Sequence, residues 1–463
     1  MPHQIKKWLI MAGMSLSTVS IGLGQDASAQ HHMALNDLQN QIDALKAQIQ
    51  TSESNDVASD QQANQSTQFG THRGAAQSLF ALDRQYTPFA KLPSSQVPLG
   101  VLMQRNNYHD GQVVIGGYVE SIAQLWNNQN MQMQRAGSQT KDFPSGGGFA
   151  LSNAKLYLMS NLGHYVQGFM TFQGQQSQDV HILEGFVNIG NLQESPFFMT
   201  FGKTRPSMGT YASGAPFMSG LTQGMFRPDY FTNATFGYQT AATGNVEQGV
   251  EISVFSPKSN GAPGNDLSSA DFIISAGDSE TIGPVSVSGL LGYVYDWRGT
   301  GMGATSGTVD GSAADVGALN RNGVINFDGQ IGYHYSDQLN YGLGIGGATT
   351  TQTSQATNNE RAGAWYVSGN VTPVIKGRPT HFGITYGHAY NTERLPMGLD
   401  AHDPSKGWAT LGAQDEFLIS ASRNVFNDNF KVSLEYGYLG LHDEPGQKER
   451  YTNLATLMLA TYF

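Results

Sequence analysis

The 463-residue sequence has no cysteine, which excludes a disulfide framework and thiol chemistry. Only 13% of its residues are charged, against about 25% in a typical soluble domain. Beyond residue 29, no segment supplies the ~20 continuous apolar residues that a membrane-spanning helix needs. With 56 glycines and a formal net charge of −11, the chain is too long for one ordinary soluble domain and too polar for a helical membrane protein.

The one long apolar run lies at the N-terminus. Lys6 and Lys7 precede an apolar stretch over 8–23, and the small residues Ala-Ser-Ala follow at 27–29. This order predicts a secretory signal peptide over residues 1–29, cleaved after the last alanine. An N-terminal membrane anchor is the less favoured alternative, because the run is short and ends in a cleavage signature.

Residues 30–50 have the pattern of a short helix. Five apolar residues recur at spacings of three and four, which places them on one seam of a helix. They are Leu35, Leu38, Ile42, Leu45 and Ile49. Because so short a helix is marginal alone in water, we predict a periplasmic coiled coil that joins copies of the chain into a homo-oligomer, or else a lone helix packed on its own barrel. The spacing does not define the number of copies.

Residues 51–111 connect this helix to the rest of the chain. As far as Gly70 they are mostly Ser, Asn, Gln, Asp and Thr, which predicts a flexible polar linker. From Leu79 onward, apolar residues are interrupted by Pro88 and Pro98, among other prolines. We therefore expect an irregular lead-in, packed at the base of the next domain or inside it.

The pattern from 112 to 463 is all-β. In one strand, Val285, Leu291 and Trp297 share an apolar face, whereas Ser286 and Asp296 point the other way. A period of two with apolar and polar faces is typical of a strand that has lipid outside and water inside. The sequence therefore predicts a transmembrane antiparallel β-barrel.

Counting the alternating segments predicts about sixteen strands. They are expected at 112–126, 149–161, 164–176, 179–190, 195–206, 233–242, 246–257, 270–277, 284–297, 322–336, 339–351, 359–373, 379–391, 413–424, 428–441 and 452–463. Connectors after even-numbered strands are short and most of the others are long, as in outer-membrane barrels with both ends at the periplasmic side. The sixth and eighth strands have the weakest pattern, so fourteen or eighteen strands are the alternatives.

Aromatic residues gather near both ends of these strands. Trp297 and Tyr386 lie near the long loops, and Tyr333 and Tyr335 near the short turns, which predicts two girdles at the lipid interfaces. The last residue, Phe463, ends an alternating strand and resembles the signal read by the outer-membrane assembly machinery. We expect outer-membrane lipid and that machinery to be partners of the chain.

The same alternation assigns a polar set of residues to the inside of the barrel. It is mixed in sign, with acids in excess. The pore-lining candidates among charged and titratable residues are Lys155, Glu184, Glu247, Glu251, Asp328, His334, His381, Lys431 and Glu435. A barrel of this size is wide enough for an aqueous channel, so selectivity requires that something narrows it.

The connector at 207–232 is the candidate for this constriction. It is long, glycine-rich and partly apolar, so we expect it to fold into the pore instead of standing exposed. The residues expected to shape the constriction are Met208, Tyr211, Phe217, Met218 and Phe226. Lys203 and Arg205 lead into the connector and either place positive charge opposite the acidic wall or form salt bridges that stiffen it.

Motifs for catalysis are weak in this sequence. Glycines within 342–347 have dinucleotide-loop spacing, but a strand follows them instead of a helix. His381 and His388 are seven residues apart in one expected strand, so they face opposite sides and do not share a metal. Because no nucleophile has a plausible base, we expect no enzymatic activity, no cofactor, no metal site and no nucleic-acid partner.

A family resemblance lies in the fifth expected strand and the connector after it. Residues 196–203 read Pro-Phe-Phe-Met-Thr-Phe-Gly-Lys and run through Arg205 and Pro206 into the long connector. With the stretches 221–239 and 246–255, this is similar to the LbtU-type siderophore porin family, over most of the chain beyond the signal peptide. The resemblance implies uptake of a ferric siderophore without an energy-coupling plug domain. The roughly 80 residues between the expected signal peptide and the first strand are also too few and too polar for a folded plug.

Two other functions remain open at this point. One is a trimeric substrate-specific porin for sugars or small carboxylates, in which the coiled coil holds the barrels together. The other is an adhesin or tether that uses the barrel only as an anchor. In every case we expect a bacterial outer-membrane protein whose mature N-terminus lies in the periplasm.

Overall fold

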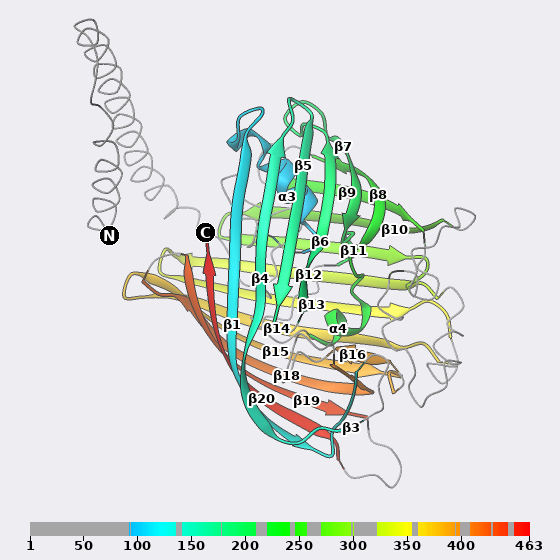
Figure 1. Ribbon diagram of the computed structural model, residues 1–463, viewed down its shortest axis with the longest axis vertical. Helices are drawn as coiled ribbons and strands as arrows, with labels where there is room; N and C mark the ends of the chain where they lie inside the picture. The colour runs from blue at the N-terminus through cyan, green and yellow to red at the C-terminus, as the bar shows by residue number, and fades with distance from the viewer. Residues whose placement is uncertain are drawn as a thin grey trace, which may run out of the picture. The chain divides into compact units, whose positions relative to one another are not determined.

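A computed structural model describes residues 92, 94–135, 141–176, 178–209, 220–240, 246–256, 270–297, 300, 322–353, 360–393, 395–398, 408–426, 429–442 and 449–463. The expected signal peptide and coiled coil lie outside the described residues. Those that are described form a closed antiparallel barrel of sixteen strands (Figure 1). The predicted strand count and fold class are therefore confirmed.

The strands follow one another around the barrel in chain order, and the last one closes on the first. They are β1 (Val113–Gln129), β4 (Gly146–Asn161), β5 (Val166–Gln175), β6 (Gln178–Ile189), β7 (Phe197–Thr204), β8 (Phe231–Gln239), β9 (Val246–Phe255), β10 (Asp271–Ile282), β11 (Val285–Val294), β12 (Val324–Ser336), β13 (Leu339–Thr350), β14 (Gly363–Ile375), β15 (Arg378–Tyr390), β18 (Ala413–Asn424), β19 (Phe430–Leu441) and β20 (Tyr451–Tyr462).

Closure joins the first strand to the chain terminus. Tyr118 of β1 lies opposite Tyr462 of β20, and the backbone of Gly117 exchanges two hydrogen bonds with Phe463, at 2.6 and 3.1 Å. The Phe463 ring lies beside Gly117, which has no side chain to displace it, and stays exposed on the outside. Every strand therefore has two paired edges, which is what a bilayer requires of backbone groups.

The two ends of the barrel differ in their connectors. At one end, here called the turn end, the connectors are short; at the other, the loop end, most are long. The largest departure from a predicted boundary is at β10, which continues to Ile282 instead of ending at 277, so that its turn consists only of Gly283 and Pro284. Gly283 adopts a φ of +57°, which glycine tolerates and which lets both strands extend to so tight a turn.

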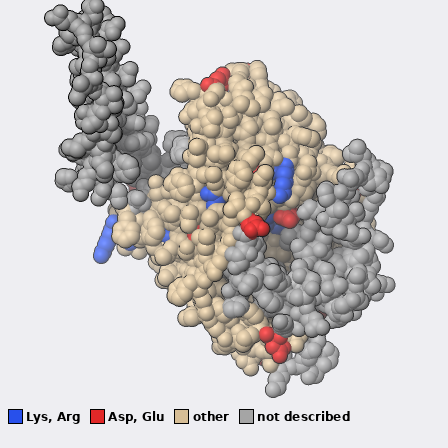
Figure 2. Space-filling model, in the orientation of Figure 1, with Lys and Arg blue, Asp and Glu red and all other residues tan. Residues whose placement is uncertain are grey.

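The outer surface is apolar, as expected for a wall that faces lipid. Outward positions of successive strands carry Val, Leu, Ile, Phe and Tyr, for example Leu343 and Ile345 on β13, which are 62% and 50% exposed. Figure 2 shows few charged residues on the visible face. Among the described residues, no helix combines the length and the apolar character needed to cross a membrane.

Two short segments lie within the barrel. The helix α3 (Val97–Met103) continues into the 3-10 helix η2 (Arg105–Asn107), ahead of β1. The helix α4 (Leu221–Phe226) belongs to the connector between β7 and β8 (Figure 1). Two loop-end connectors also pair into a small sheet, in the order β16 (Pro396–Gly398), β17 (Trp408–Leu411), β2 (Gln132–Arg135) and β3 (Lys141–Asp142).

One predicted girdle residue faces the other way. Alternation in β11 ends at Val294, and Trp297 turns inward, where it is 1% exposed and its ring lies 5.4 Å from that of Phe226. Tyr295 stays outside and stacks on Phe272. The correction follows from the early end of the strand, because the period of two applies only while the chain remains extended.

Candidate functional site: the barrel lumen

The inner face of the barrel wall carries a row of polar residues. Glu184, Asp328, Lys431 and Glu435 are buried, whereas the outward neighbours on their strands are apolar and partly or fully exposed. The same parity places Lys155, Glu247, Glu251, His334 and His381 on the inner wall. Within the described segments, no group of three or more His, Asp or Glu side chains is placed to hold a metal ion.

Some of these inward side chains are fixed by neighbours on the wall. The carboxylate of Asp328 accepts hydrogen bonds from the Tyr366 hydroxyl and the Asn326 amide, both at 2.8 Å. Glu184 accepts one from the Thr171 hydroxyl at 3.0 Å. Such bonds offset the cost of burying a carboxylate away from bulk water.

Lys203 departs from the expectation that it faces the pore. It lies opposite the exposed Thr232 and on the same face as the outward Phe201, two residues earlier. Its ammonium donates to the carbonyl oxygen of Ile182 at 2.9 Å. The reason is the period of two: β7 still runs as a strand through Lys203, so this side chain shares the lipid-side parity.

Arg205 does point inward, but toward the lead-in and the connector. Its guanidinium donates to the hydroxyl of Ser94 at 2.7 Å and lies 3.8 Å from the carboxylate of Asp229. It also lies over the ring of Tyr230, 4.1 Å from the centroid. Arg205 thus ties three segments together at the point where the connector leaves β7.

After Arg205 the described start of the connector, 206–209, lies inside the barrel. Met208 is fully buried, and its carbonyl oxygen accepts a hydrogen bond of 3.3 Å from the side-chain amide of Asn326 on β12. A Cβ at Gly292 of β11 would lie only 1.9 Å from that carbonyl oxygen, and one at Gly209 would lie 2.2 Å from the Asn326 amide nitrogen. The backbone therefore presses directly on the inner wall, and glycine is what permits it.

The end of the connector packs under the loop end. Phe226 is fully buried with Leu221 and Met225 in α4, within a large apolar cluster of the inner wall and the loop-end connectors. Met397 of the small sheet packs against α4 at Gly224, where a Cβ would lie 2.9 Å from the methionine Cγ. Tyr211, Phe217 and Met218 lie outside the described residues.

The lead-in is a feature that sequence reasoning located only loosely. Val101 and Leu102 of α3 are buried against aromatic side chains of the inner wall. Those are Tyr118, Tyr157, Phe169, Phe186, Phe198 and Tyr462. Aromatic residues at inward positions are unnecessary in a water-filled lumen, so they were the signal in the sequence that another segment packs there.

Polar contacts fix the same segment in place. The amide of Asn188 donates to the carbonyl oxygen of Pro98 at 2.8 Å, and that of Gln167 donates to Val101 at 3.3 Å. Ser95 donates to the carbonyl oxygen of Gly209 at 3.4 Å, which joins the lead-in to the connector. The lead-in and connector therefore form one obstruction that crosses the lumen from β6 and β7 toward β12.

Exposure of inward residues shows which wall is left free. On β5, beneath the lead-in, Gln167, Phe169 and Thr171 are buried. Across the barrel, at the turn end of β12 to β15, inward residues keep contact with solvent, among them Gln330, Asn340, Asn370, Thr372 and His381. The inner wall from β12 to β15 is therefore partly exposed to solvent at this end, and the exposed side chains are mainly neutral hydrogen-bonding groups.

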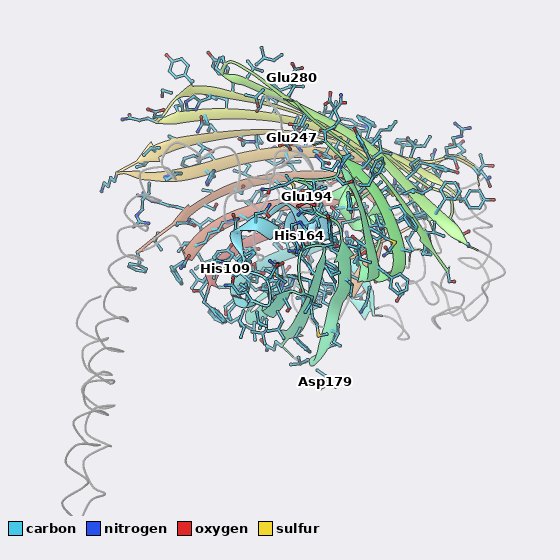
Figure 3. All side chains as sticks on the ribbon, turned by 90° about the horizontal axis from the view of Figure 1, so that it is seen from above. His109, His164, Asp179, Glu194, Glu247 and Glu280 are labelled. Carbon is cyan, nitrogen blue, oxygen red and sulfur yellow. The ribbon has the colours of Figure 1, made fainter. Side chains whose placement is uncertain are left out.

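A cluster of titratable residues joins two connectors at the turn end. His164 contacts the carboxylate of Glu194, and the Tyr165 hydroxyl donates to this carboxylate at 2.6 Å; His164 and Glu194 are labelled in Figure 3. These bonds from Tyr165 and His164 lower the pKa of Glu194, and the same carboxylate raises the pKa of Tyr165. The cluster is exposed and serves to hold the turns together.

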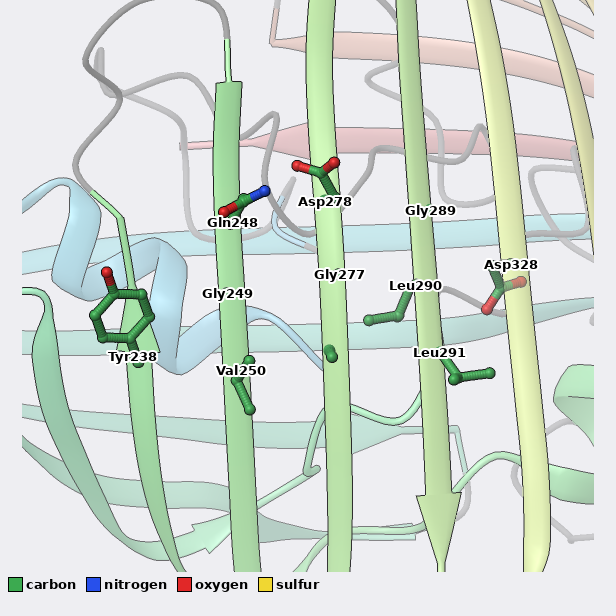
Figure 4. A pocket seen from close by; sticks show the side chains of 11 residues that line it. Tyr238, Gln248, Gly249, Val250, Gly277, Asp278, Gly289, Leu290, Leu291 and Asp328 are labelled. Atoms are coloured by element: carbon green, nitrogen blue, oxygen red, sulfur yellow. The ribbon is translucent and has the colours of Figure 1, made fainter.

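A groove of about 560 Å³ is lined by residues of β8 to β12 (Figure 4). Its outward residues include Tyr238, Val250 and Leu291, and glycines at 249, 277 and 289 thin the wall. Asp278 and Gln248 add polar groups on the outer side. Because most of its lining residues face outward, the lumen remains the candidate site.

Similarity to known proteins is found for a family model and for solved structures. The family model described as "Protein of unknown function (DUF3573)" matches residues 83–319, just over half of the 463-residue chain. No curated protein matches the sequence. Among solved structures, the outer membrane channel DcaP of Acinetobacter baumannii has 10% identity and a TM-score of 0.46, over 76% of this chain and 98% of its own. The anion-selective porin from Comamonas acidovorans has 9% identity and a TM-score of 0.46, over 76% and 100%. A loop-deleted OmpT, an outer membrane protein of Vibrio cholerae, has 15% identity and a TM-score of 0.45, over 77% of this chain and 100% of its own.

Proposed function

The chain belongs to the DUF3573 family, and we propose that it is an outer-membrane porin that passes a small solute through a constricted lumen. The observation that carries this proposal is the packing of the two described parts of the connector: 205–209 leave the wall at β7 and press on β11 and β12, and 220–230 include α4, which packs inside the barrel. A barrel that served only as an anchor has no need of a segment packed across its own lumen.

The barrel wall supports transport in two further ways. Its outside is apolar and its inside polar, so water and a solute are separated from lipid along the whole path. The solvated wall from β12 to β15 supplies hydrogen-bonding groups along which a solute exchanges water for protein contacts. In this proposal the turn end faces the periplasm and the loop end the exterior, as the connector lengths predict.

We propose a ferric siderophore as the solute, on the strength of the resemblance at 196–206 to the LbtU-type family. A siderophore complex is polar and rich in oxygen atoms, which suits a wall that offers amide, hydroxyl and histidine donors. A sugar or small carboxylate is the second candidate. It is favoured by the neutral character of Gln330, Asn340, Asn370 and Thr372, which offer hydrogen bonds without a fixed charge.

Conductance in planar bilayers tests the channel. Purified wild-type protein is expected to carry a small ion current, and a variant in which a short Gly-Ser turn replaces residues 208–229 is expected to carry a much larger one. Absence of current from both proteins contradicts the proposal and leaves the anchor function. Both proteins must show the heat-dependent gel mobility of a folded barrel before the currents are compared.

Growth of a deletion strain separates the solutes. The siderophore proposal expects slower growth on iron-chelated medium with the strain's own siderophore, restored by the wild-type protein. Unchanged iron-siderophore uptake contradicts it. Slower uptake of a sugar or carboxylate at low concentration then identifies the second candidate.

A further inference from the structure

The inner wall around α4 is built from small residues. Where this helix packs against β13, β14, β15 and the start of β18, many of the inward positions are alanine or glycine: Ala348, Ala362, Ala364, Gly387, Ala389 and Ala413. At Gly387, a Cβ would lie 3.4 Å from Cδ1 of Leu221. These positions form a recess that α4 fills, so the wall and the helix have matching shapes.

One carboxylate stands in this recess. Glu416 of β18 is fully buried, and its Oε2 accepts a hydrogen bond from the backbone N–H of Leu221, the first residue of α4, at 3.0 Å. Its Oε1 is also buried and has no hydrogen-bond partner among the described residues. A buried carboxylate with one free oxygen is unfavourable for folding alone, since an apolar side chain would fill the recess at lower cost.

Resting on the proposed channel function, we propose that Glu416 is a positioning residue that holds α4 in its recess by its bond to Leu221, and that loss of this bond lets α4 leave the lumen. The apolar contacts of α4 give it shape complementarity, but they do not fix its orientation. A hydrogen bond to one backbone N–H is directional, so it fixes the first residue of α4 relative to β18. Breaking it leaves a buried polar group with no partner, which favours admission of water to the recess.

The absence of cysteine makes this testable with one introduced thiol. Thr222, the second residue of α4, is 2% exposed, so a Thr222→Cys variant of the full chain is expected to react slowly with a membrane-impermeant maleimide. Adding Glu416→Ala is expected to raise the labelling rate by about tenfold or more and to raise the bilayer conductance toward that of the connector-replaced protein.

Conservative and matched variants separate the hydrogen bond from general damage. Glu416→Gln keeps an oxygen acceptor for the Leu221 N–H, so it is expected to restore slow labelling and low conductance.

Leu221→Pro removes the donor at the first helical position, where proline is tolerated, and is expected to behave like Glu416→Ala. Leu221→Ala loses the side-chain packing but keeps the donor, and is expected to label more slowly than Leu221→Pro. Ile419→Val, on the outer face of the same strand, is expected to leave both readouts unchanged.

The outcomes distinguish this inference from the channel proposal. If the connector-replaced protein conducts but Glu416→Ala and Leu221→Pro keep wild-type labelling and conductance, the positioning role is wrong and the channel stands. An equal rise in the labelling rate of Glu416→Ala and Glu416→Gln also contradicts the positioning role, because the oxygen acceptor that glutamine keeps at position 416 would then have no effect on α4. If no protein conducts, the channel proposal fails, and the labelling rates still decide whether Glu416 holds α4. Should Glu416→Ala not fold, Leu221→Pro gives the same test.

Discussion

At the scale of single residues, the absence of a side chain decides where the connector lies. Gly292 faces inward on β11, and the carbonyl of Met208 occupies the space that a Cβ would need. The sequence shows where glycines lie but not why, because a glycine on a strand can face water, lipid or another backbone and the sequence does not distinguish these surroundings. The connector, not the strand, makes this one necessary.

Gly292→Ala is therefore expected to push the connector off the wall. The added methyl group meets backbone instead of a flexible side chain, so a cost of about 1 to 3 kcal/mol is expected, with a higher ion conductance. Gly289→Ala is the control on the same strand, since its Cβ would lie 3.9 Å from the nearest atom, the carbonyl oxygen of Asp328. Equal conductance in the two variants would contradict the packed position of the connector.

A second residue-scale prediction concerns His442, just beyond β19. Its ring contacts the Thr392 hydroxyl at 3.0 Å, and burial lowers its pKa in spite of the nearby Glu393. The pKa of an unfolded histidine is about 6.5. When folding lowers this pKa, the histidine stabilises the folded state at a pH above about 6.5, and this stabilisation is lost as the pH falls from this value toward the lower, folded-state pKa. The temperature at which the loop end opens should thus drop between about pH 7 and pH 5, measured by proteolysis against temperature. His442→Gln should show a smaller drop; an equal drop would assign the effect to other groups.

At the scale of elements, the packing of α3 shows what a local pattern leaves undetermined. The lead-in has too many prolines and too short a helix to be stable alone, so only its aromatic partners on β1, β4 to β7 and β20 keep it in place. Those partners come from strands far apart in the chain. Their inward parity was readable from the sequence, but the identity of what they contact was not.

Val101→Asp is expected to detach the lead-in, because a charge at this fully buried position costs several kcal/mol. The chain should then be cut by added protease within residues 92–112 while the barrel itself stays resistant. Asn107→Asp adds the same charge at an exposed position of η2 and is the matched control. If both variants resist the protease equally, the packing of α3 does not depend on this contact.

At the scale of the whole molecule, the bilayer is the solvent that gives the barrel its shape. Each strand leaves backbone groups that only a neighbouring strand can satisfy, and the circle closes where Phe463 meets Gly117. The same bilayer is in contact with the outward side chains, which explains why the outer surface tolerates little polarity.

Leu343→Arg is expected to destabilise the folded barrel by about 2 to 4 kcal/mol, because it places a charge on the lipid face of β13. Gln330→Arg lies at a neighbouring register position of β12 but faces the lumen, so it should cost less than about 1 kcal/mol. Folding into lipid vesicles at increasing urea concentrations measures both. The opposite order of the two variants would mean that the faces are assigned the wrong way round.

Most of the barrel was predictable from local pattern, and most of the lumen was not. The strands at 233–242 and 270–277 had the weakest pattern and still proved to be β8 and β10, because period two survives one or two exceptions. Lys203 and Trp297 were misplaced for different reasons. Lys203 lies within the predicted strand 195–206 and shares the outward side of Phe201, so the period of two already opposed its assignment to the pore. β11 ends at Val294, three residues before the predicted end, so the period of two no longer applies at Trp297.

The sequence by itself determined the barrel, its strand count near sixteen and the two faces of its wall, since alternation and connector length are local properties that the bilayer enforces. Only the tertiary structure decided what occupies the inside. That the lead-in packs on β4 to β7, that the connector presses on Gly292, and that Glu416 meets the first residue of α4 all depend on contacts between residues as many as 195 positions apart. Such contacts leave no periodic mark in a single chain, because they are set by the shape of the closed barrel.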